Sequence, residues 1–274
     1  MTPQIHLHVL ASGSKGNAAV VEGPAGSVLV DDGIPRRTLL ARARELGISM
    51  DDVRAVLLTH EHTDHVSGLS VFANHFDGPL FATAGTIAAR ERLSQLPFEV
   101  IGHTDSLELC GMLIRVFPTS HDVADPVGFR FATVDGNGEL VDALGYCTDT
   151  GALTDEAGQA LTGCRVLALE SNHDERMLAT GPYPGFLKQR IHGRLGHLSN
   201  AQAASALPDL VTSETEVIVG MHLSHENNRP SVAVRALAAA VGAEAANATF
   251  TEARTPDGHL TVCVAAQDAP LSVW

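Results

Sequence analysis

The apolar positions of the chain fall into short runs separated by glycine, proline or polar turns. β-Branched runs near the start predict three strands of a meander, at 5–10, 18–22 and 28–30. Pro35 then opens a stretch with apolar residues at helical spacing, and Gly47 follows it. A helix is therefore expected between these two residues.

From residue 56 the pattern alternates between strand and helix. The apolar run 56–58 predicts a strand. It is followed by a predicted helix at 66–76, a strand at 80–82 and a helix at 86–93. Strands that alternate with helices in this way are typical of α/β layering.

After residue 100 the period of the apolar positions changes, which indicates a second sheet. Strand-like runs lie at 100–101, 106–109, 113–117, 128–134, 140–147, 166–169, 217–219, 249–250 and 260–264. Helices are expected at 201–207, with Ser199 or Asn200 as the N-cap, and at 232–241. The segment Asp135-Gly136-Asn137-Gly138 favours a hairpin turn. No linker or repeat interrupts the pattern, so we expect one α/β domain over residues 1–274, made of two related halves.

The composition is that of an ordinary globular protein, with 45% hydrophobic and 18% charged residues. No apolar stretch approaches the roughly 18 residues of a membrane span, and residues 1–8 lack the features of a signal peptide. We therefore expect a cytoplasmic protein without a membrane partner. The four cysteines form no CxxC pair and are interpreted as buried reduced thiols.

The net charge of −14 argues against wide, non-specific wrapping of nucleic acid, because phosphate neutralisation needs clustered lysine and arginine. It leaves room for a local cationic cleft. Bound divalent ions would themselves be the largest positive charges in such a site.

The candidate chemistry centres on the segment His60-Glu61-His62-Thr63-Asp64-His65, which directly follows a predicted strand. Neutral imidazole and carboxylate are ligands that suit Zn²⁺, Mn²⁺ or Fe. His60 and His62 are close enough to converge on one ion, while Asp64 and His65 face a second. Two adjacent divalent ions are therefore expected. The alternative is a histidine-rich surface turn in a chain with 14 histidines.

Further polar residues follow other predicted strands. Asp31 ends the strand at 28–30, where it would hold a ligand histidine by its second nitrogen or belong to an exposed turn. His121, Asp149 and His222 also come at strand ends. A site with two ions on residues 60–65 needs a further histidine and a bridging carboxylate, which these residues would supply.

Two segments are candidates for binding an anion. The turn Ser12-Gly13-Ser14-Lys15-Gly16-Asn17 offers backbone N–H groups and a lysine, although a plain hairpin explains it equally well. It lacks the P-loop spacing. The densest basic segment contains Lys188, Arg190 and Arg194, and is either an anion cradle or a solvated helix face.

Together these motifs resemble the metallo-β-lactamase fold superfamily. The strings ASGSKGN, HEHTDH, HDVADPVGF, TDTG, ESNHD, YPGFLKQRIHGRLGHLSN and HLSHENN are similar to those of its WalJ (YycJ) group, bacterial relatives of tRNA 3′-processing nucleases associated with DNA exonuclease activity. The resemblance covers nearly the whole chain. It implies an αββα four-layer sandwich, with two mixed sheets face to face and helices outside.

The resemblance also implies a role for each candidate residue. One ion would be bound by His60, His62 and His121, and the other by Asp64, His65 and His222. Asp149 would bridge the ions, and Asp31 would support a ligand from behind. Glu170 and His197 match residues that assist proton transfer in the related tRNA nucleases. Lys15, Asn17, Lys188 and Arg190 are the candidates for contacts with the substrate.

The function expected from the sequence is that of a metal-dependent phosphodiesterase. It would act on DNA ends, most simply as an exonuclease that attacks with a hydroxide shared between the ions. Asp64 would accept a proton, and His197, held by Glu170, would donate one to the leaving oxygen. The alternative is a small-molecule hydrolase for a thioester, lactone or other ester, and less readily a β-lactam. Monomer and dimer remain equally compatible with the sequence.

Overall fold

The computed structural model describes residues 4–274, which separate into two compact units. The first unit consists of 4–118, Val123–Ala143 and Gln267–Trp274. The second consists of Thr119–Asp122 and Leu144–Ala266. The expectation of one domain over residues 1–274 stays a prediction.

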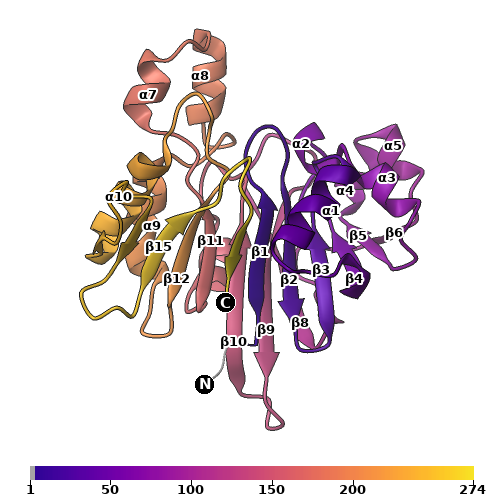
Figure 1. Cartoon of the computed structure of the whole chain (residues 1–274). Coiled ribbons are helices and arrows are strands. Elements are labelled where there is room, and N and C mark those ends of the chain that lie inside the picture. Colours follow the sequence, from indigo (N-terminus) through magenta and orange to yellow (C-terminus); the bar gives the residue numbers. More distant parts are fainter. Residues whose placement is uncertain (1–3) are drawn as a thin grey trace. The chain divides into compact units, whose positions relative to one another are not determined.

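A mixed sheet of seven strands forms the body of the first unit (Figure 1). Its strands lie in the order β16-β1-β2-β3-β4-β5-β6. Neighbours from β16 to β3 are antiparallel, and those from β3 to β6 are parallel. The bounds are β1 His6–Ala11, β2 Ala18–Gly23, β3 Gly26–Val30, β4 Val53–Leu57, β5 Leu80–Ala82, β6 Phe98–Val100 and β16 Leu271–Val273.

The helices of this unit are short and supply side chains to one apolar core with the sheet. The bounds are α1 Arg36–Glu45, a 3₁₀ turn at Met50–Asp52, α2 Thr63–Val66, α3 Leu69–Ala73, α4 Ala84–Ala88 and α5 Glu91–Ser94. Leu39 of α1 and Leu69 of α3 are fully buried with Val56 of β4. Burial of apolar surface away from water between these helices and the sheet holds them together.

The two helices predicted at 66–76 and 86–93 are each divided into two shorter ones. The first break falls at Gly68, where a Cβ atom would lie 2.1 Å from the Ile34 carbonyl oxygen. The backbone N–H of Gly68 donates to Asp32 instead, at 2.9 Å. The second break falls at Arg90, whose backbone is extended. The N–H of Gly68 is therefore bonded to a neighbouring loop and not to the preceding helical turn, which interrupts the helix although the backbone of Gly68 stays right-handed.

Three antiparallel strands complete the first unit: β7 Ser106–Leu109, β8 Met112–Pro118 and β9 Val127–Val134. The turn after β9 is built as predicted for Asp-Gly-Asn-Gly. The Asp135 carboxylate accepts from the backbone N–H groups of Asn137 and Glu139, and the Asp135 N–H donates to Glu139. This confirms the tight turn ahead of the next strand.

The second unit is built on parallel strands whose carboxyl ends share one edge. Here β10 Leu140–Cys147, through its residues 144–147, pairs with β11 Val166–Glu170, which pairs with β12 Val217–Met221 and then β15 Thr261–Val264. Two antiparallel strands, β14 Glu252–Arg254 and β13 Glu244–Ala245, follow at the far side. Because ligands bind beyond the carboxyl ends of parallel strands, this edge is where a site is expected.

The helices of the second unit are α6 Asp155–Leu161, α7 Glu175–Thr180, α8 Gly185–His192, α9 Asn200–Leu210 and α10 Pro230–Val241. The predicted cap of α9 is confirmed at Ser199, which accepts from the Gln202 N–H while the Gln202 side chain accepts from the Ser199 N–H. The N-terminal part of α8 and all of α7 stand out from the sheet of this unit (Figure 1). No side chain of α8 is buried.

The predicted strand at Thr249-Phe250 is wrong. Asn247 closes a turn there, since its side-chain oxygen accepts from the backbone N–H of Thr251 and its carbonyl from that of Phe250. Phe250 takes φ +53°, which a strand does not allow. Local side-chain bonding by asparagine outweighs the β propensity of threonine and phenylalanine. Glu252–Arg254 forms the strand instead.

Parallel strands with helical connections confirm the α/β class in both units. Within residues 4–274, every helix is too short or too polar to cross a lipid bilayer.

Candidate functional site

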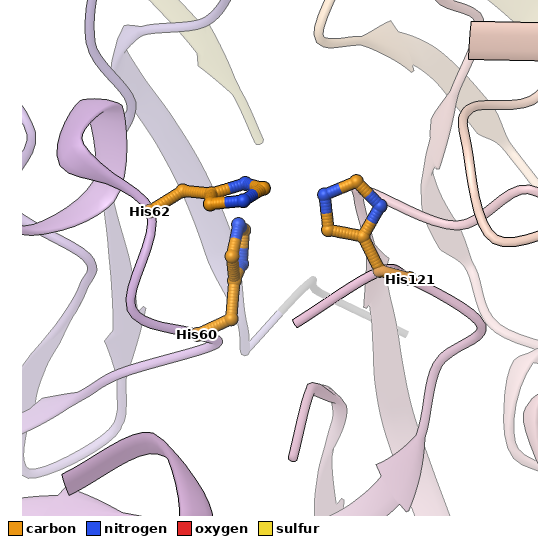
Figure 2. Close-up of side chains that lie close together, drawn as sticks. All are labelled: His60, His62 and His121. Carbon is orange, nitrogen blue, oxygen red and sulfur yellow. The ribbon is translucent and has the colours of Figure 1, made fainter. Parts of the chain in front are cut away.

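The first unit places four candidate ligands directly after β4. His60 and His62 follow the strand, and Asp64 and His65 lie in α2. Figure 2 shows the imidazoles of His60 and His62 next to each other, with ring centroids 4.9 Å apart and planes at 75°. The His65 ring lies 4.0 Å from that of His60. The segment therefore gathers three imidazoles at the carboxyl end of one buried strand.

Two of these rings are oriented by oxygen atoms behind them. Nδ1 of His65 lies 2.8 Å from the Asp31 carboxylate, which also accepts from the Thr59 hydroxyl. Nδ1 of His60 lies 3.0 Å from that same hydroxyl oxygen. With the proton on each Nδ1, the lone pair is on Nε2, the nitrogen that can bind a metal ion. Such support by carboxylate or hydroxyl is typical of histidines that ligate metals.

Asn17 lies inside this cluster and is almost fully buried. Its backbone N–H donates to the Asp64 carbonyl at 2.7 Å, and its side-chain oxygen accepts from the Gly13 N–H at 2.8 Å. Its side-chain amide lies 3.0 Å from His65 Nε2 and 3.3 Å from the Asp64 carboxylate. Asn17 thus orients Asp64 and His65, and an ion bound at His65 Nε2 would displace its amide.

Gly33 is the point where the chain passes closest to the ligand segment. Its N–H donates to the Asn17 carbonyl at 2.8 Å, and a Cβ atom there would lie 1.6 Å from the Asp64 carbonyl oxygen. No rotamer relieves such a clash, because the position of a Cβ atom is fixed by the backbone and the oxygen that it meets is a backbone atom.

Gly33→Ala is therefore expected to lower the free energy of unfolding by about 3–5 kcal/mol. Urea unfolding followed by circular dichroism measures this change. Gly136→Ala is the matched control, since a Cβ there meets no atom within 4 Å. Equal stability of the two variants would contradict the close approach.

The second unit presents its own polar cluster at the carboxyl edge of its parallel strands. Asp149 follows β10, Glu170 ends β11 and His222 follows β12. Asp149 Oδ1 lies 3.4 Å from His222 Nδ1 and 3.6 Å from His197 Nδ1. Asp149, Glu170, His197 and His222 each offer a ligand atom within 4.8 Å of the others. This edge therefore brings together four of the candidate site residues predicted from the sequence.

His121, the third side chain labelled in Figure 2, belongs to this unit and is buried. Its Nδ1 donates to the Gly196 carbonyl at 2.9 Å, which leaves the lone pair on Nε2. Nε2 lies 3.9 Å from Asp149 Oδ1. Burial lowers the pKa of His121, so the ring is neutral, the form that can bind a metal.

Glu170 is fully buried and organises the surrounding donors. Oε1 lies 2.7 Å from His197 Nδ1 and 3.2 Å from His222 Nδ1. Oε2 accepts from the backbone N–H groups of Thr150 at 2.8 Å and Leu198 at 3.2 Å. Burial opposes ionisation of Glu170, but the attraction of His197 outweighs it and lowers the pKa of the carboxyl. The pKa of His197 is raised because the same attraction overcomes its burial.

Three of the candidate residues have left-handed backbone: Asp31 at φ +58°, Asp149 at φ +53° and His222 at φ +54°. Non-glycine residues rarely adopt this conformation, which costs of order 1–3 kcal/mol each. In each case the turn follows a buried strand and redirects a side chain. Strain of this kind is concentrated at functional sites.

Comparison with known proteins identifies the family. The model described as "Beta-lactamase superfamily domain" matches residues 27–223. The chain belongs to this superfamily. It is 35% identical over 233 residues to Exodeoxyribonuclease YycJ of Bacillus anthracis, covering 84% of this chain and 86% of that protein. It is 34% identical over 228 residues to Exodeoxyribonuclease WalJ of Streptococcus pneumoniae, covering 80% and 82%.

A solved structure shows the same fold. The metallo-β-lactamase fold protein YhfI from Bacillus subtilis superposes with a TM-score of 0.66 at 15% identity, covering 98% of this chain and all of that one. The resemblance to the metallo-β-lactamase superfamily and its WalJ (YycJ) group is thereby confirmed, and with it the fold class. As a member, the chain is a metal-dependent hydrolase with a histidine and aspartate cluster suited to divalent metal.

The residues predicted to contact substrate have varied surroundings in this superfamily member. Lys15 is exposed, whereas Asn17 is turned into the cluster described above. Lys188 Nζ donates to the Ala179 carbonyl at 2.8 Å. Arg190 donates through Nη2 to Asp122 Oδ1 at 3.1 Å and through Nε to the other carboxylate oxygen. The charge of Arg190 is thus balanced by Asp122, so its role as a phosphate contact stays a prediction.

Three residues that shape the cluster were not predicted from the sequence. Thr59 connects Asp31 to two histidines, Asp122 pairs with Arg190, and Asn172 donates to the His222 carbonyl at 2.8 Å. Each is a polar residue adjacent to a candidate ligand or at the end of a buried strand. That position is the only signal in the sequence that points to them.

His173 has no assigned role, yet it is fully buried. Within residues 4–274, neither of its ring nitrogens has a hydrogen-bond partner. Burial lowers the pKa of His173 to about 4, against about 6.5 in an unfolded chain. Between these values the unfolded chain binds the proton and the folded one does not, so stability falls as the pH falls.

Lowering the pH from 7 to 5 should therefore remove about 2 kcal/mol of stability through His173 alone. Urea unfolding at both pH values, compared between the wild type and His173→Gln, isolates this contribution. The variant should lose correspondingly less stability, while His75→Gln, at an exposed position, should behave as the wild type. An identical loss in all three proteins would show that His173 does not titrate in this way.

Proposed function

We propose that the protein is a DNA exonuclease that hydrolyses phosphodiester bonds at a centre of two divalent ions. The observation that carries this proposal is the contact of the buried Glu170 carboxylate with Nδ1 of the half-buried His197, at 2.7 Å, beside Asp149. The exodeoxyribonucleases YycJ and WalJ, at 35% and 34% identity over most of the chain, support the choice of DNA.

The proposed ligand set is the one that the family resemblance implies. The first ion would be held by His60, His62 and His121, and the second by Asp64, His65 and His222, with Asp149 as the shared carboxylate. Support for this comes from the tautomers of three imidazoles. Oxygen atoms behind His60, His65 and His121 contact each Nδ1, which leaves Nε2 as the ligand atom. Zn²⁺ and Mn²⁺ suit these donors, and Fe²⁺ is compatible with them.

When bound, divalent ions supply Lewis acidity and an activated water near neutral pH. Residues of the chain transfer the protons and position the strand. Asp64 Oδ2 accepts the proton of the attacking water. His197, charged because the Glu170 carboxylate holds its Nδ1, donates a proton from Nε2 to the leaving oxygen. The strand itself is positioned through its phosphates by Lys15 and Lys188, contacts that carry no sequence information.

A time course on end-labelled duplex DNA tests the proposal. Protein stripped of metal is assayed alone and after addition of Mn²⁺, Mg²⁺ or Zn²⁺. Stepwise shortening from one end, dependent on metal, is the expected result. Metal binding should also raise the melting temperature, because an ion at about 100 times its Kd adds about 2.7 kcal/mol of stability.

Intact DNA with every metal, from protein that demonstrably binds two ions, would overturn the nuclease proposal. The same loaded protein should then be tested on thioester and lactone substrates. Cutting at internal positions without shortening from an end would retain the phosphodiesterase and reject the exonuclease.

A further inference from the structure

The largest apolar side chain left exposed on α8 is Phe186, with 74% of its surface accessible. It is the second residue of a helix of eight residues in which nothing is buried. A helix of this length is marginal on its own in water, and burial of an apolar face is what normally stabilises one. The exposed ring therefore lacks the packing that would explain it in the protein alone.

The surroundings of Phe186 are cationic. Residues 175–194 contain Arg176, Lys188, Arg190 and Arg194 against a single acidic residue, Glu175, which gives +3 for this segment in a chain of −14. Asp122 balances Arg190, so the local excess is +2. Four of the 18 lysines and arginines of the chain thus lie in these 20 residues. Arg176 and Arg194 are exposed. A polyanion is the partner that such a surface attracts.

The helix geometry places the ring on the face of α8 that leads to the candidate site. Phe186 and Arg190 are four residues apart and so lie on one face, about 6 Å apart along the axis. Arg190 is bound to Asp122, whose Oδ1 lies 3.8 Å from Nε2 of the candidate ligand His121. Five residues beyond α8 is His197, whose N–H donates to the Ile191 carbonyl at 2.9 Å.

We propose that Phe186 is a stacking platform for a base of the DNA strand near the end being degraded. This rests on the proposed nuclease function and extends it to how the strand is held. An aromatic ring stacks on any base without reading it, and the neighbouring Arg176, Lys188 and Arg194 neutralise the backbone. Since stacked nucleotides advance about 3.4 Å each, the rise of about 6 Å from Phe186 to Arg190 corresponds to about two nucleotides.

The test measures binding separately from hydrolysis. Fluorescence anisotropy in EDTA compares a labelled single strand with the same strand carrying abasic sites in place of its terminal four bases. Phe186→Ala should weaken binding of the normal strand on the order of tenfold. It should leave binding of the abasic strand unchanged. Phe186→Trp, which keeps a stacking surface, should restore wild-type affinity.

Leu195→Ala is the matched control, because Leu195 is an exposed apolar residue just beyond the same helix, with 56% of its surface accessible. It should not change either affinity. The proposal is overturned if Phe186→Ala discriminates between the two strands as the wild type does, or weakens both equally. If Phe186→Ala converts a dimer into a monomer in solution and leaves DNA binding intact, this surface is a contact between copies of the chain and the proposal is wrong.

The outcomes separate this inference from the function on which it rests. If the wild type shortens DNA in the presence of metal, but Phe186→Ala has the wild-type affinity and discrimination, only the stacking platform is disproved. Wild-type protein that neither binds nor hydrolyses DNA removes both proposals.

Discussion

Asp64→Asn is expected to lower the rate of DNA shortening by at least about a thousandfold, with the fold intact. The substitution preserves the shape of the side chain and removes the negative charge that we assign to proton acceptance and metal binding. The Asn17 side-chain NH₂ donates to the Asp64 carboxylate at 3.3 Å, and the new amide at position 64 can turn its oxygen toward this donor, so the packing should hold. Single-turnover cleavage of end-labelled DNA at saturating Mn²⁺ measures the effect.

Two controls make this result specific. Melting temperatures of the metal-free variant and wild type should agree within a few degrees, and Asp77→Asn, at an exposed position, should retain full activity. Metal content by mass spectrometry then separates the two roles of the residue. A variant that keeps two ions yet is inactive has lost the proton acceptor. A variant with undiminished activity would remove Asp64 from the centre altogether.

Glu170→Gln should damage both stability and catalysis. The carboxylate is fully buried, and its two oxygens face four N–H groups or ring nitrogens. A glutamine presents its own NH₂ group to some of these donors, so at least one polar contact is lost in the interior. We expect about 2–4 kcal/mol less stability and a cleavage rate about a hundredfold lower.

Urea unfolding and single-turnover cleavage at a temperature where the variant is folded measure the two effects separately. Glu156→Gln, an exposed position on α6, is the matched control and should change neither. If Glu170→Gln retains the wild-type rate, His197 does not depend on this carboxylate for its proton. The assignment of the pair would then be wrong.

The sequence predicted the elements that have a strong local pattern. The β strands at 80–82, 106–109 and 140–147 have the predicted bounds, because short runs rich in apolar residues there are bounded by turn residues. The N-cap at Ser199 was predictable for the same reason, since a hydroxyl followed three residues later by glutamine is itself a local signal.

Tertiary contacts decide what the sequence could not predict. Nothing in the pattern around Gly68 indicates that its N–H donates to the Asp32 carbonyl, outside the helix. The helix α7 was not predicted, and α8 was expected only as one of two alternatives, a solvated helix face, because neither has a clear apolar periodicity. Among the candidate site residues, Asn17 was predicted to contact substrate because its loop resembles an anion cradle, and its contacts with Asp64 appear only in the folded chain.

The left-handed turns at Asp31, Asp149 and His222 limit which sequences can evolve at these positions. Only glycine and asparagine readily adopt such backbone in place of aspartate or histidine, and neither provides the original charge or imidazole. A residue that restored the chemistry without tolerating the geometry would tilt its side chain away from the cluster. We therefore expect saturation mutagenesis at these three positions to show two separate requirements, one for left-handed backbone and one for the side-chain chemistry. Folded but inactive variants should be confined to glycine and asparagine, and β-branched residues should be lost from the soluble fraction.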